Sequence, residues 1–185
     1  MPAATLKWFF WTPHILSSHT ANMFEIKSTL PADKPAAYAE LATLLQGLLT
    51  GETDFIANAA NTAALIFNAL PELNWAGFYR LVEGELVLGP FQGKPACVRL
   101  QLGKGVCGTA AQQRQTVLVP DVHAFPGHIA CDAASRSEIV VPVIKDGRLL
   151  GVLDLDSPVL SRFDAADQAG LERLVAIFVE ATANH

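Results

Sequence analysis

The amino-acid sequence predicts a single α+β domain in which a central, mainly antiparallel six-stranded sheet is flanked by helices. First, a chain of 185 residues, 51% of them hydrophobic, can bury roughly 70% of its unfolded surface in one core. Second, hydrophobic residues recur at helical spacing up to Pro71 and then alternate with the period of a strand. Third, short turns such as Glu83-Gly84 separate the strands, which is typical of antiparallel hairpins.

Two helices are expected at the start of the fold and one at its end. Asp33 can cap the first helix, Pro35 suits its first turn, and Gly51 ends it. The second helix is expected at about 52–70. Asp164 can cap the closing helix.

Six strands and one short helix are expected between these helices. The predicted strands are 74–82, 85–89, 98–102, 116–119, 137–144 and 148–156. The short helix is expected at 106–113, and a long loop at 123–136 leads to the fifth strand. Long ordered loops in compact domains are often functional, so this loop is a candidate part of a site.

Charge and hydropathy disfavour two classes of partner. The net charge is −5 and no basic run occurs, so no nucleic-acid partner is expected. No apolar run reaches the roughly 18–20 residues that cross a bilayer, so no membrane association is expected either. Residues 1–22 are expected to be a poorly ordered N-terminal extension, and 23–185 the folded domain. The aromatic run at 8–11 leaves an anchor for a membrane interface or a partner as the alternative.

All three cysteines lie in one stretch of the chain, as Cys97, Cys107 and Cys131. A domain of this size needs no disulfide framework, and an odd number of cysteines cannot be fully paired within it. No export signal is recognised, so reactive thiols in a reducing, cytoplasmic compartment are expected. The cysteine spacings of 10 and 24 residues match no common zinc pattern, and no metal is expected.

The surroundings of Cys131 favour a reactive thiol. His128 and Arg136 flank it, and a nearby cation favours the nucleophilic thiolate. A buried, inert cysteine is the alternative. His123 and His128 are interpreted as loop residues rather than metal ligands.

The first predicted strand places Trp75, Gly77 and Tyr79 on one face and Ala76 and Phe78 on the other. Glycine between two aromatic residues leaves a notch on that face. Ordinary core packing is the alternative interpretation.

The last predicted strand carries Asp154 and Asp156 on one face and Leu153 and Leu155 on the other. A solvated sheet edge would explain two carboxylates, but Val152 on their face suggests that it is covered. Two carboxylates held close together raise each other's pKa, so one can stay protonated and act as an acid.

The hairpin between the last two strands decides whether Glu138 joins these aspartates. A two-residue Asp146-Gly147 turn would pair Ile139 with Asp154 and send Glu138 to the opposite face. A three-residue Lys145-Asp146-Gly147 loop with a G1 bulge would pair Glu138 with Asp154. We predict the second register, which gathers three carboxylates on one face.

From about Phe24 to Thr182, the sequence resembles the GAF-domain free methionine-(R)-sulfoxide reductases. The motifs that carry the resemblance are Asn74-Trp-Ala-Gly-Phe-Tyr79, Leu88-Gly-Pro-Phe-Gln-Gly-Lys-Pro-Ala-Cys97, Gly103-Lys-Gly-Val-Cys-Gly108, Val119-Pro-Asp-Val122, His128-Ile-Ala-Cys-Asp132, Ser135-Arg-Ser-Glu-Ile-Val-Val-Pro-Val143 and Gly151-Val-Leu-Asp-Leu-Asp-Ser157. A general GAF sensor domain would share the fold but not this set of cysteines, aromatic residues and acids. The resemblance implies a GAF domain over 23–185.

The resemblance also implies roles for the cysteines. Cys131 matches the catalytic thiol, Cys97 the resolving cysteine, and Cys107 a third cysteine that can pair with Cys97. The implied reaction reduces free L-methionine (R)-S-oxide through a Cys131 sulfenic acid and a Cys97–Cys131 disulfide, which thioredoxin reduces. It requires no metal or organic cofactor.

The remaining implied roles form a substrate pocket. Trp75 and Tyr79 match residues around the sulfoxide and methyl end of the substrate. Glu138, Asp154 and Asp156 match carboxylates that bind its polar groups, and Asp156 or Glu138 is expected to protonate the sulfoxide oxygen. A homodimer is expected, because GAF domains often pair through their terminal helices. The alternatives are a GAF module that binds a small ligand and a redox sensor, both without catalysis.

Overall fold

The computed structural model describes residues 30–128 and 132–183. The expected extension at 1–22 and the thiol of Cys131 lie outside the described residues, and so does the start of the domain at residue 23. Within the described residues, the elements follow the predicted order. They are α1 (Lys34–Leu49), α2 (Phe55–Ala69), β1 (Trp75–Val82), β2 (Glu85–Gly93), β3 (Arg99–Gln101), α3 (Gly105–Gln113), β4 (Val117–Val119), the 3₁₀ turn η1 (Val122–Ala124), β5 (Ser137–Lys145), β6 (Arg148–Ser157) and α4 (Ala165–Ala181).

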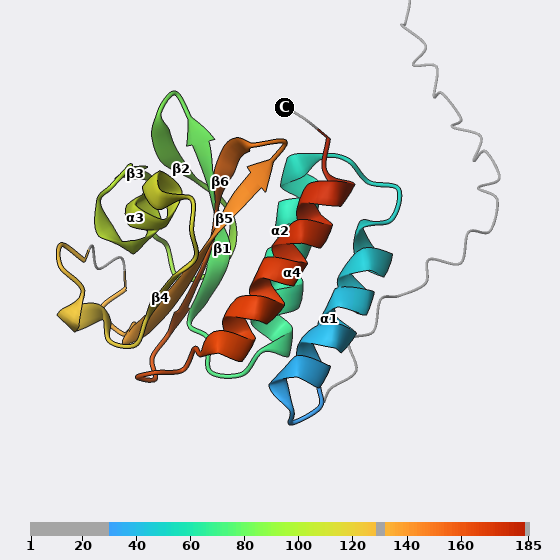
Figure 1. Ribbon diagram of the computed structural model, residues 1–185, viewed down its shortest axis with the longest axis horizontal. Coiled ribbons are helices and arrows are strands. Elements are labelled where there is room, and N and C mark those ends of the chain that lie inside the picture. The colour runs from blue at the N-terminus through green and yellow to red at the C-terminus, as the bar shows by residue number, and fades with distance from the viewer. Residues whose placement is uncertain (1–29, 129–131, 184–185) are drawn as a thin grey trace, which may run out of the picture.

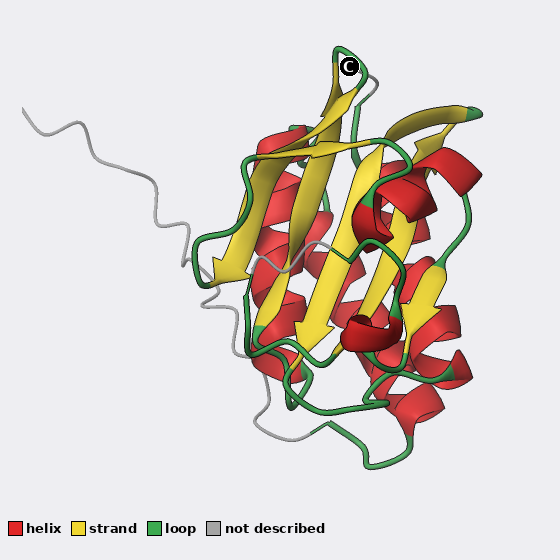
Figure 2. Cartoon of the chain, turned by 90° about the vertical axis from the view of Figure 1, so that its left-hand side faces the viewer, coloured by secondary structure: helices red, strands yellow, loops and turns green. Residues whose placement is uncertain are grey.

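The six strands form one sheet in the order β3-β2-β1-β6-β5-β4, and every neighbouring pair is antiparallel. Helices α2 and α4 pack against one face of this sheet, and α1 packs on these two helices (Figure 1). The opposite face carries α3, η1 and the loops around them (Figure 2). The prediction of an α+β fold with a central antiparallel sheet and flanking helices is therefore confirmed.

Aspartate caps set the starts of the three long helices. The carboxylate of Asp33 accepts a hydrogen bond from the backbone N–H of Ala36, and Asp164 forms a reciprocal capping box in α4. The second helix begins at Phe55 rather than near residue 52, because Asp54 supplies its cap. These caps satisfy backbone N–H groups that have no partner within the helix.

The main hydrophobic core lies between the sheet and the three long helices. Strand alternation sends Ala76 and Phe78 of β1 into this core, together with Leu153 and Leu155 of β6, as predicted. The ring of Phe178 in α4 lies 4.8 Å from that of Phe78. A second, smaller core on the opposite face contains the other side chains of the same strands. Each central strand therefore packs one face against the long helices and turns the other face toward α3.

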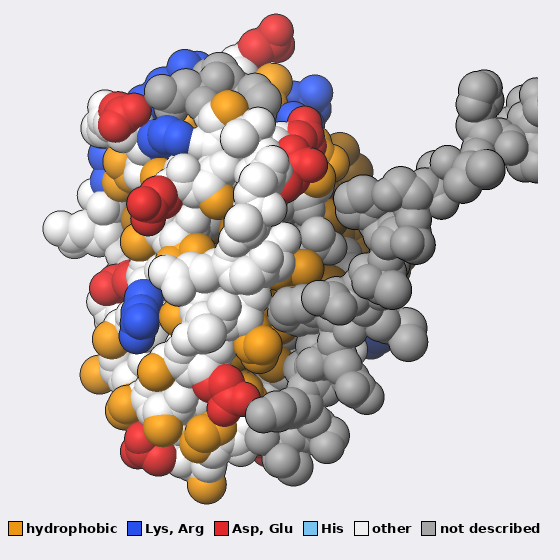
Figure 3. All heavy atoms as spheres, turned by 90° about the vertical axis from the view of Figure 1, so that its right-hand side faces the viewer, with side chains coloured by type: hydrophobic (Ala, Val, Ile, Leu, Met, Phe, Trp, Pro, Cys, Tyr) orange, Lys and Arg blue, Asp and Glu red, His pale blue; other side chains and the backbone are white. Residues whose placement is uncertain are grey.

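A buried charged cluster fastens α1 to α4. Asp167, 1% exposed, accepts a hydrogen bond from the Tyr38 hydroxyl at 2.9 Å and forms ion pairs with Lys34 and Arg162. Beyond this cluster, the outer surface of the helix layer mixes acidic, basic and hydrophobic side chains where it is visible (Figure 3). Among the described helices, none is long and apolar enough to cross a membrane.

The β5–β6 hairpin corrects the predicted register. Its turn is the two-residue Asp146-Gly147, with positive φ at both residues, and Lys145 pairs with Arg148. The expected three-residue loop is therefore wrong, and Glu138 pairs with Asp156 rather than with Asp154.

One extra residue in β6 keeps the carboxylates together despite the shorter turn. Ile144 pairs with Leu149 and Val143 pairs with Gly151, so Leu150 is a bulge between them. This bulge shifts the pairing of the two strands by one residue. Glu138 therefore lies on the same face as the two aspartates, whereas the two-residue turn alone would have sent it to the opposite face. The prediction that Glu138 joins both aspartates on one face is therefore right, although the partner and the cause differ.

Strand β2 continues to Gly93, four residues past the expected end at Gly89, and pairs along its length with β1. After it, the chain has no regular structure from residue 94 to residue 98, and β3 begins at Arg99. This irregular segment carries Cys97 past the α3 side of the sheet.

Candidate active site

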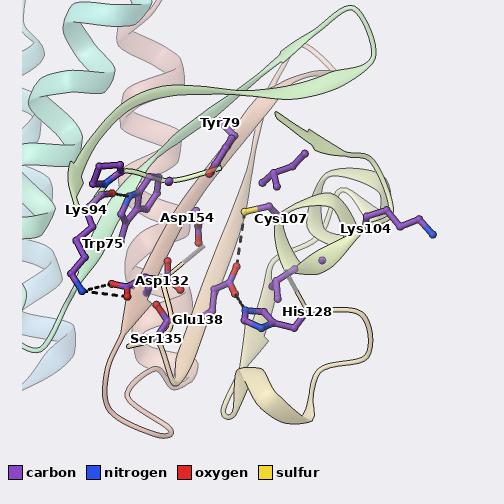
Figure 4. Close-up of a pocket in the computed structure, with 16 residues that line it drawn as sticks. Trp75, Tyr79, Lys94, Lys104, Cys107, His128, Asp132, Ser135, Glu138 and Asp154 are labelled. Atoms are coloured by element: carbon purple, nitrogen blue, oxygen red, sulfur yellow. Dashed lines mark hydrogen bonds and ion pairs between the residues drawn. The ribbon is translucent and has the colours of Figure 1, made fainter. Parts of the chain in front are cut away.

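A pocket lies on the α3 side of the sheet, at the end where β1, β5 and β6 carry their polar residues (Figure 4). Six of the residues predicted for a site line it: Trp75, Tyr79, Cys107, Glu138, Asp154 and Asp156. The other lining residues are Lys94, Pro95, Ala96, Leu100, Lys104, Gly105, Val106, His128, Asp132 and Ser135. The fold thus brings together side chains that are up to 81 positions apart in the sequence, counted from Trp75 to Asp156.

Three carboxylates form the floor of this pocket. Glu138 and Asp154 are each 6% exposed, and Asp156 lies beside Glu138 in the β5–β6 ladder. The Oδ1 atom of Asp154 is buried without a hydrogen-bond partner among the described residues. An unpaired buried acceptor is costly unless a ligand supplies a donor, so the pocket is suited to a group that carries N–H or O–H.

Burial controls the protonation of these acids. Removal from water raises the pKa of Glu138 and of Asp154 well above their usual values, and repulsion from the neighbouring carboxylates raises both further. Burial also raises the pKa of Asp156 to about 7, although a hydrogen bond from Ser135 opposes the rise. At neutral pH the cluster therefore holds protons that it can donate.

Cys107 approaches the carboxylates from α3. Its Sγ atom lies 4.0 Å from Oε1 of Glu138, and the thiol is free and buried. Burial, followed by the fields of Asp154 and Glu138, raises the pKa of this thiol well above its usual value. Cys107 therefore stays protonated and is a poor nucleophile.

Cys107, Glu138 and Asp154 are also the group of described residues whose potential ligand atoms lie close enough for a metal ion, all within 4.8 Å of one another. The unpaired Oδ1 atom of Asp154 also suits an N–H donor such as an ammonium group. The arrangement therefore does not indicate one particular metal.

An aromatic wall stands above the floor. The rings of Trp75 and Tyr79 are stacked with centroids 5.9 Å apart, and Phe91 of β2 stacks on Trp75 at 5.3 Å. A Cβ atom at Gly77 would lie 2.3 Å from Cβ of Phe91 and 2.7 Å from the Trp75 ring. The predicted notch at Gly77 is therefore real but filled, because its neighbours' side chains use the space.

The cysteines differ in what surrounds them. The backbone carbonyl of Cys97 accepts a hydrogen bond from the Tyr79 hydroxyl at 3.0 Å, and Cys97 is disulfide-bonded. It directly follows Ala96, which lines the pocket. Because Cys131 lies outside the described residues, its pairing with Cys97 stays a prediction.

Sequence reasoning missed several polar residues of the pocket. His128, interpreted as a loop residue, has its Nε2 atom 3.7 Å from Oε2 of Glu138, and burial lowers its pKa. His123, by contrast, is exposed and lies beside Asp121, as a loop residue would. Apart from its place in the motif that ends at Asp132, no pattern distinguished His128 from His123.

A second missed set closes the rim of the pocket. Asp132 forms an ion pair with Lys94 at 3.3 Å and accepts a hydrogen bond from the Asn74 side chain at 3.2 Å. A hydrogen bond from the backbone N–H of Ala134, followed by the contacts with Asn74 and Lys94, lowers the pKa of Asp132. Asp132 is therefore an anion that ties the loop before β5 to the segment after β2.

The fold and this enclosed acidic pocket define a GAF domain, and a family model described as GAF domain matches residues 57–181. The free methionine-R-sulfoxide reductase of Escherichia coli (strain K12) is 54% identical over 144 residues, covering 78% of this chain and 87% of that protein. The enzyme of the same name from Saccharomyces cerevisiae is 44% identical over 167 residues, covering 86% and 92%. A solved structure of the free methionine-R-sulfoxide reductase from Neisseria meningitidis, in complex with its substrate, superposes with a TM-score of 0.79 at 46% identity, covering 84% of this chain and 95% of that one. The chain belongs to the free methionine-R-sulfoxide reductase family of GAF-domain proteins.

Proposed function

We propose that this protein reduces free L-methionine (R)-S-oxide to L-methionine. The observation that carries the proposal is the pocket in which buried, protonated carboxylates face an aromatic wall. An electrophilic sulfoxide sulfur needs a proton or a strong hydrogen bond on its oxygen, and a buried acid supplies one. Membership of a family whose relatives carry this activity in their names supports the same reaction.

The pocket suits a free amino acid better than a residue within a chain. A free amino acid carries an α-ammonium group, which can donate to the unpaired Oδ1 atom of Asp154 and lie among Glu138 and Asp156. The methyl and sulfoxide end would then contact the rings of Trp75 and Tyr79. A peptide-bound methionine lacks the ammonium group and would leave the buried acceptor without a donor.

In the proposed chemical step, the thiolate of Cys131 attacks the sulfoxide sulfur while Asp156 or Glu138 donates a proton to the oxygen. The oxygen ends on Cys131 as a sulfenic acid, and methionine leaves as the thioether. The substrate sulfur gains two electrons and Cys131 loses two. The raised pKa values of the two acids support a donor that is still protonated at neutral pH.

In the proposed resolving step, the Cys97 thiol attacks the sulfenic acid, which forms a Cys97–Cys131 disulfide and releases water. The disulfide-bonded state of Cys97 and the free, buried state of Cys107 support Cys97 as the resolver. Thioredoxin, a dithiol protein, would reduce the disulfide by exchange. We further propose that the folded domain, residues 23–185, acts in the cytoplasm in the response to oxidative stress, as a homodimer without a cofactor.

The test follows NADPH consumption by the full chain with thioredoxin, its reductase and each epimer of free methionine sulfoxide. We expect consumption with the R epimer and little with the S epimer. Cys131→Ser should abolish turnover, and Cys97→Ser should release about one methionine per enzyme and then stop.

Three results would contradict parts of this scheme. The absence of any NADPH consumption that depends on the R epimer would indicate a sensor or a binding module instead of an enzyme. Substantial turnover by Cys131→Ser would remove Cys131 as the nucleophile. Normal cycling of Cys97→Ser with thioredoxin would make Cys107 the resolver.

A further inference from the structure

The segment at residues 94–97 is held by side chains of β1 rather than by a strand ladder. The Tyr79 hydroxyl donates to the carbonyl oxygen of Cys97 at 3.0 Å, and Nε1 of Trp75 donates to the carbonyl oxygen of Lys94 at 3.2 Å. Figure 4 shows both aromatic side chains beside this segment, with Lys94 reaching Asp132. Residues 94–96 line the pocket, so the segment forms part of its wall.

Tyr79 is a well-placed donor for this contact. Its side chain is 2% exposed, and stacking on Trp75 fixes the ring. Burial and the nearby acids, first of all Asp154, raise the pKa of the phenol, so the hydroxyl keeps the proton that it donates. The position of the hydroxyl is therefore set by β1, the rigid centre of the sheet.

The contact falls at the point where the resolving chemistry would take place. Immediately after Cys97, the carbonyl of Val98 accepts a hydrogen bond from the backbone N–H of Leu88 at 2.9 Å. Cys97 thus lies between a carbonyl held by β2 and a segment held by two aromatic side chains. A disulfide forms only within a narrow range of Cα and Cβ separations, so the backbone position of Cys97 affects the rate.

We infer that the Tyr79 hydroxyl is a positioning group for the resolving step, which it serves by holding the carbonyl of Cys97. The inference rests on the proposed function. In that step the Cys97 sulfur attacks the sulfenic sulfur of Cys131, the S–S bond forms and the S–O bond breaks. The hydroxide that leaves takes the thiol proton of Cys97 and departs as water. In the proposed function the ring of Tyr79 contacts the substrate, and in this inference its hydroxyl positions Cys97.

A single-turnover experiment on Tyr79→Phe tests this assignment, because the substitution removes the hydroxyl and keeps the ring. Reduced enzyme is mixed with one equivalent of methionine (R)-sulfoxide, and quenched samples are measured for released methionine and for alkylatable Cys97. We expect the delay between methionine release and loss of the Cys97 thiol to lengthen about fivefold, the factor that one neutral hydrogen bond contributes. Trapping of the sulfenic acid by dimedone should increase in parallel.

Tyr38→Phe is the matched control, since it also removes a buried hydroxyl, the one that donates to Asp167 in the helix layer. Its delay should equal that of the wild type. An unchanged delay in Tyr79→Phe, or an equal lengthening in Tyr38→Phe, would overturn the inference.

The inference can also be separated from the proposed function. If wild-type enzyme releases no methionine, the proposed function fails. The rate at which iodoacetamide alkylates Cys97 in the reduced protein then tests the positioning role alone. We expect this rate to rise about fivefold in Tyr79→Phe and to stay unchanged in Tyr38→Phe, and equal rates in all three proteins would refute it.

Discussion

Replacement of Asp156 by asparagine should make the protein more stable and inactive at the same time. The carboxylate lies on the pocket floor, and burial raises its pKa from 3.8 to about 7. The folded protein therefore binds a proton at Asp156 that the unfolded chain releases, and folding takes up this proton between about pH 4 and pH 7. Stability consequently falls as the pH rises through that window. Asparagine cannot ionise, so the free energy of unfolding of the variant does not fall over this pH range.

The magnitude follows from the two pKa values. A difference between 3.8 and about 7 corresponds to about 4 kcal/mol, since one pKa unit is worth about 1.4 kcal/mol. The Asp156 side chain keeps some contact with solvent, which screens part of this free energy. We therefore expect Asp156→Asn to raise the free energy of unfolding by about 2–4 kcal/mol at pH 8, and by less than about 1 kcal/mol at pH 4.5.

Urea denaturation of both proteins at the two pH values measures this difference directly. Glu83→Gln, in the exposed β1–β2 turn, is the control and should change stability equally at both pH values. Turnover of free methionine sulfoxide by Asp156→Asn should fall at least a hundredfold, because general acids typically contribute about 10²–10⁴-fold. A stability gain that is the same at pH 4.5 and pH 8, or a loss at pH 8, would refute the reasoning about Asp156.

Three further predictions follow from the pocket and its support. The rate of sulfoxide reduction should fall as the pH rises through about 7, because Asp156 loses its proton there; a pH–rate profile between pH 5 and 9 measures this, and a rate that rises throughout would contradict it. Gly77→Ala should lower the free energy of unfolding by about 1–3 kcal/mol and raise KM, because its Cβ would displace Phe91 and the Trp75 ring; denaturation and steady-state kinetics test both effects. Asp167→Ala should lower the free energy of unfolding by about 3–5 kcal/mol, since it removes the buried carboxylate that pairs with Arg162 and accepts the Tyr38 hydrogen bond, yet KM should stay unchanged because the cluster joins α1 to α4; a changed KM in the folded variant would count against this separation.

Much of the fold could be predicted because it depends on local patterns. Alternation in β1 correctly divided Ala76 and Phe78 from Trp75 and Tyr79, since the side-chain period of a strand is a property of the backbone. Aspartate at a helix start is similarly local, and Asp33 and Asp164 cap as expected. The second helix begins later than expected because Asp54 caps its N-terminus.

Contacts between distant segments set the features that sequence reasoning missed. The bulge at Leu150 leaves no pattern in a run of hydrophobic residues, because the bulged residue still packs partly on the core. The approach of His128 to Glu138 joins a loop to a strand ten positions away, and no periodicity relates them. The extension of β2 to Gly93 arises from pairing with β1 through a stretch that contains Pro90.

The Leu150 bulge has a consequence for loop engineering and for comparison within the family. A deletion or insertion of one residue in the Asp146-Gly147 turn would be expected to disturb only a surface loop. In this hairpin it would exchange the two faces of β6 and bury Leu153 and Leu155 where the acids now lie, unless the bulge were lost or duplicated with it. Turn length and bulge therefore have to change together, which makes paired insertions and deletions at these two places the pattern to look for among homologous sequences. A longer hairpin grafted into this enzyme should likewise add an even number of residues between Lys145 and Gly151. Otherwise the two faces of β6 would be exchanged.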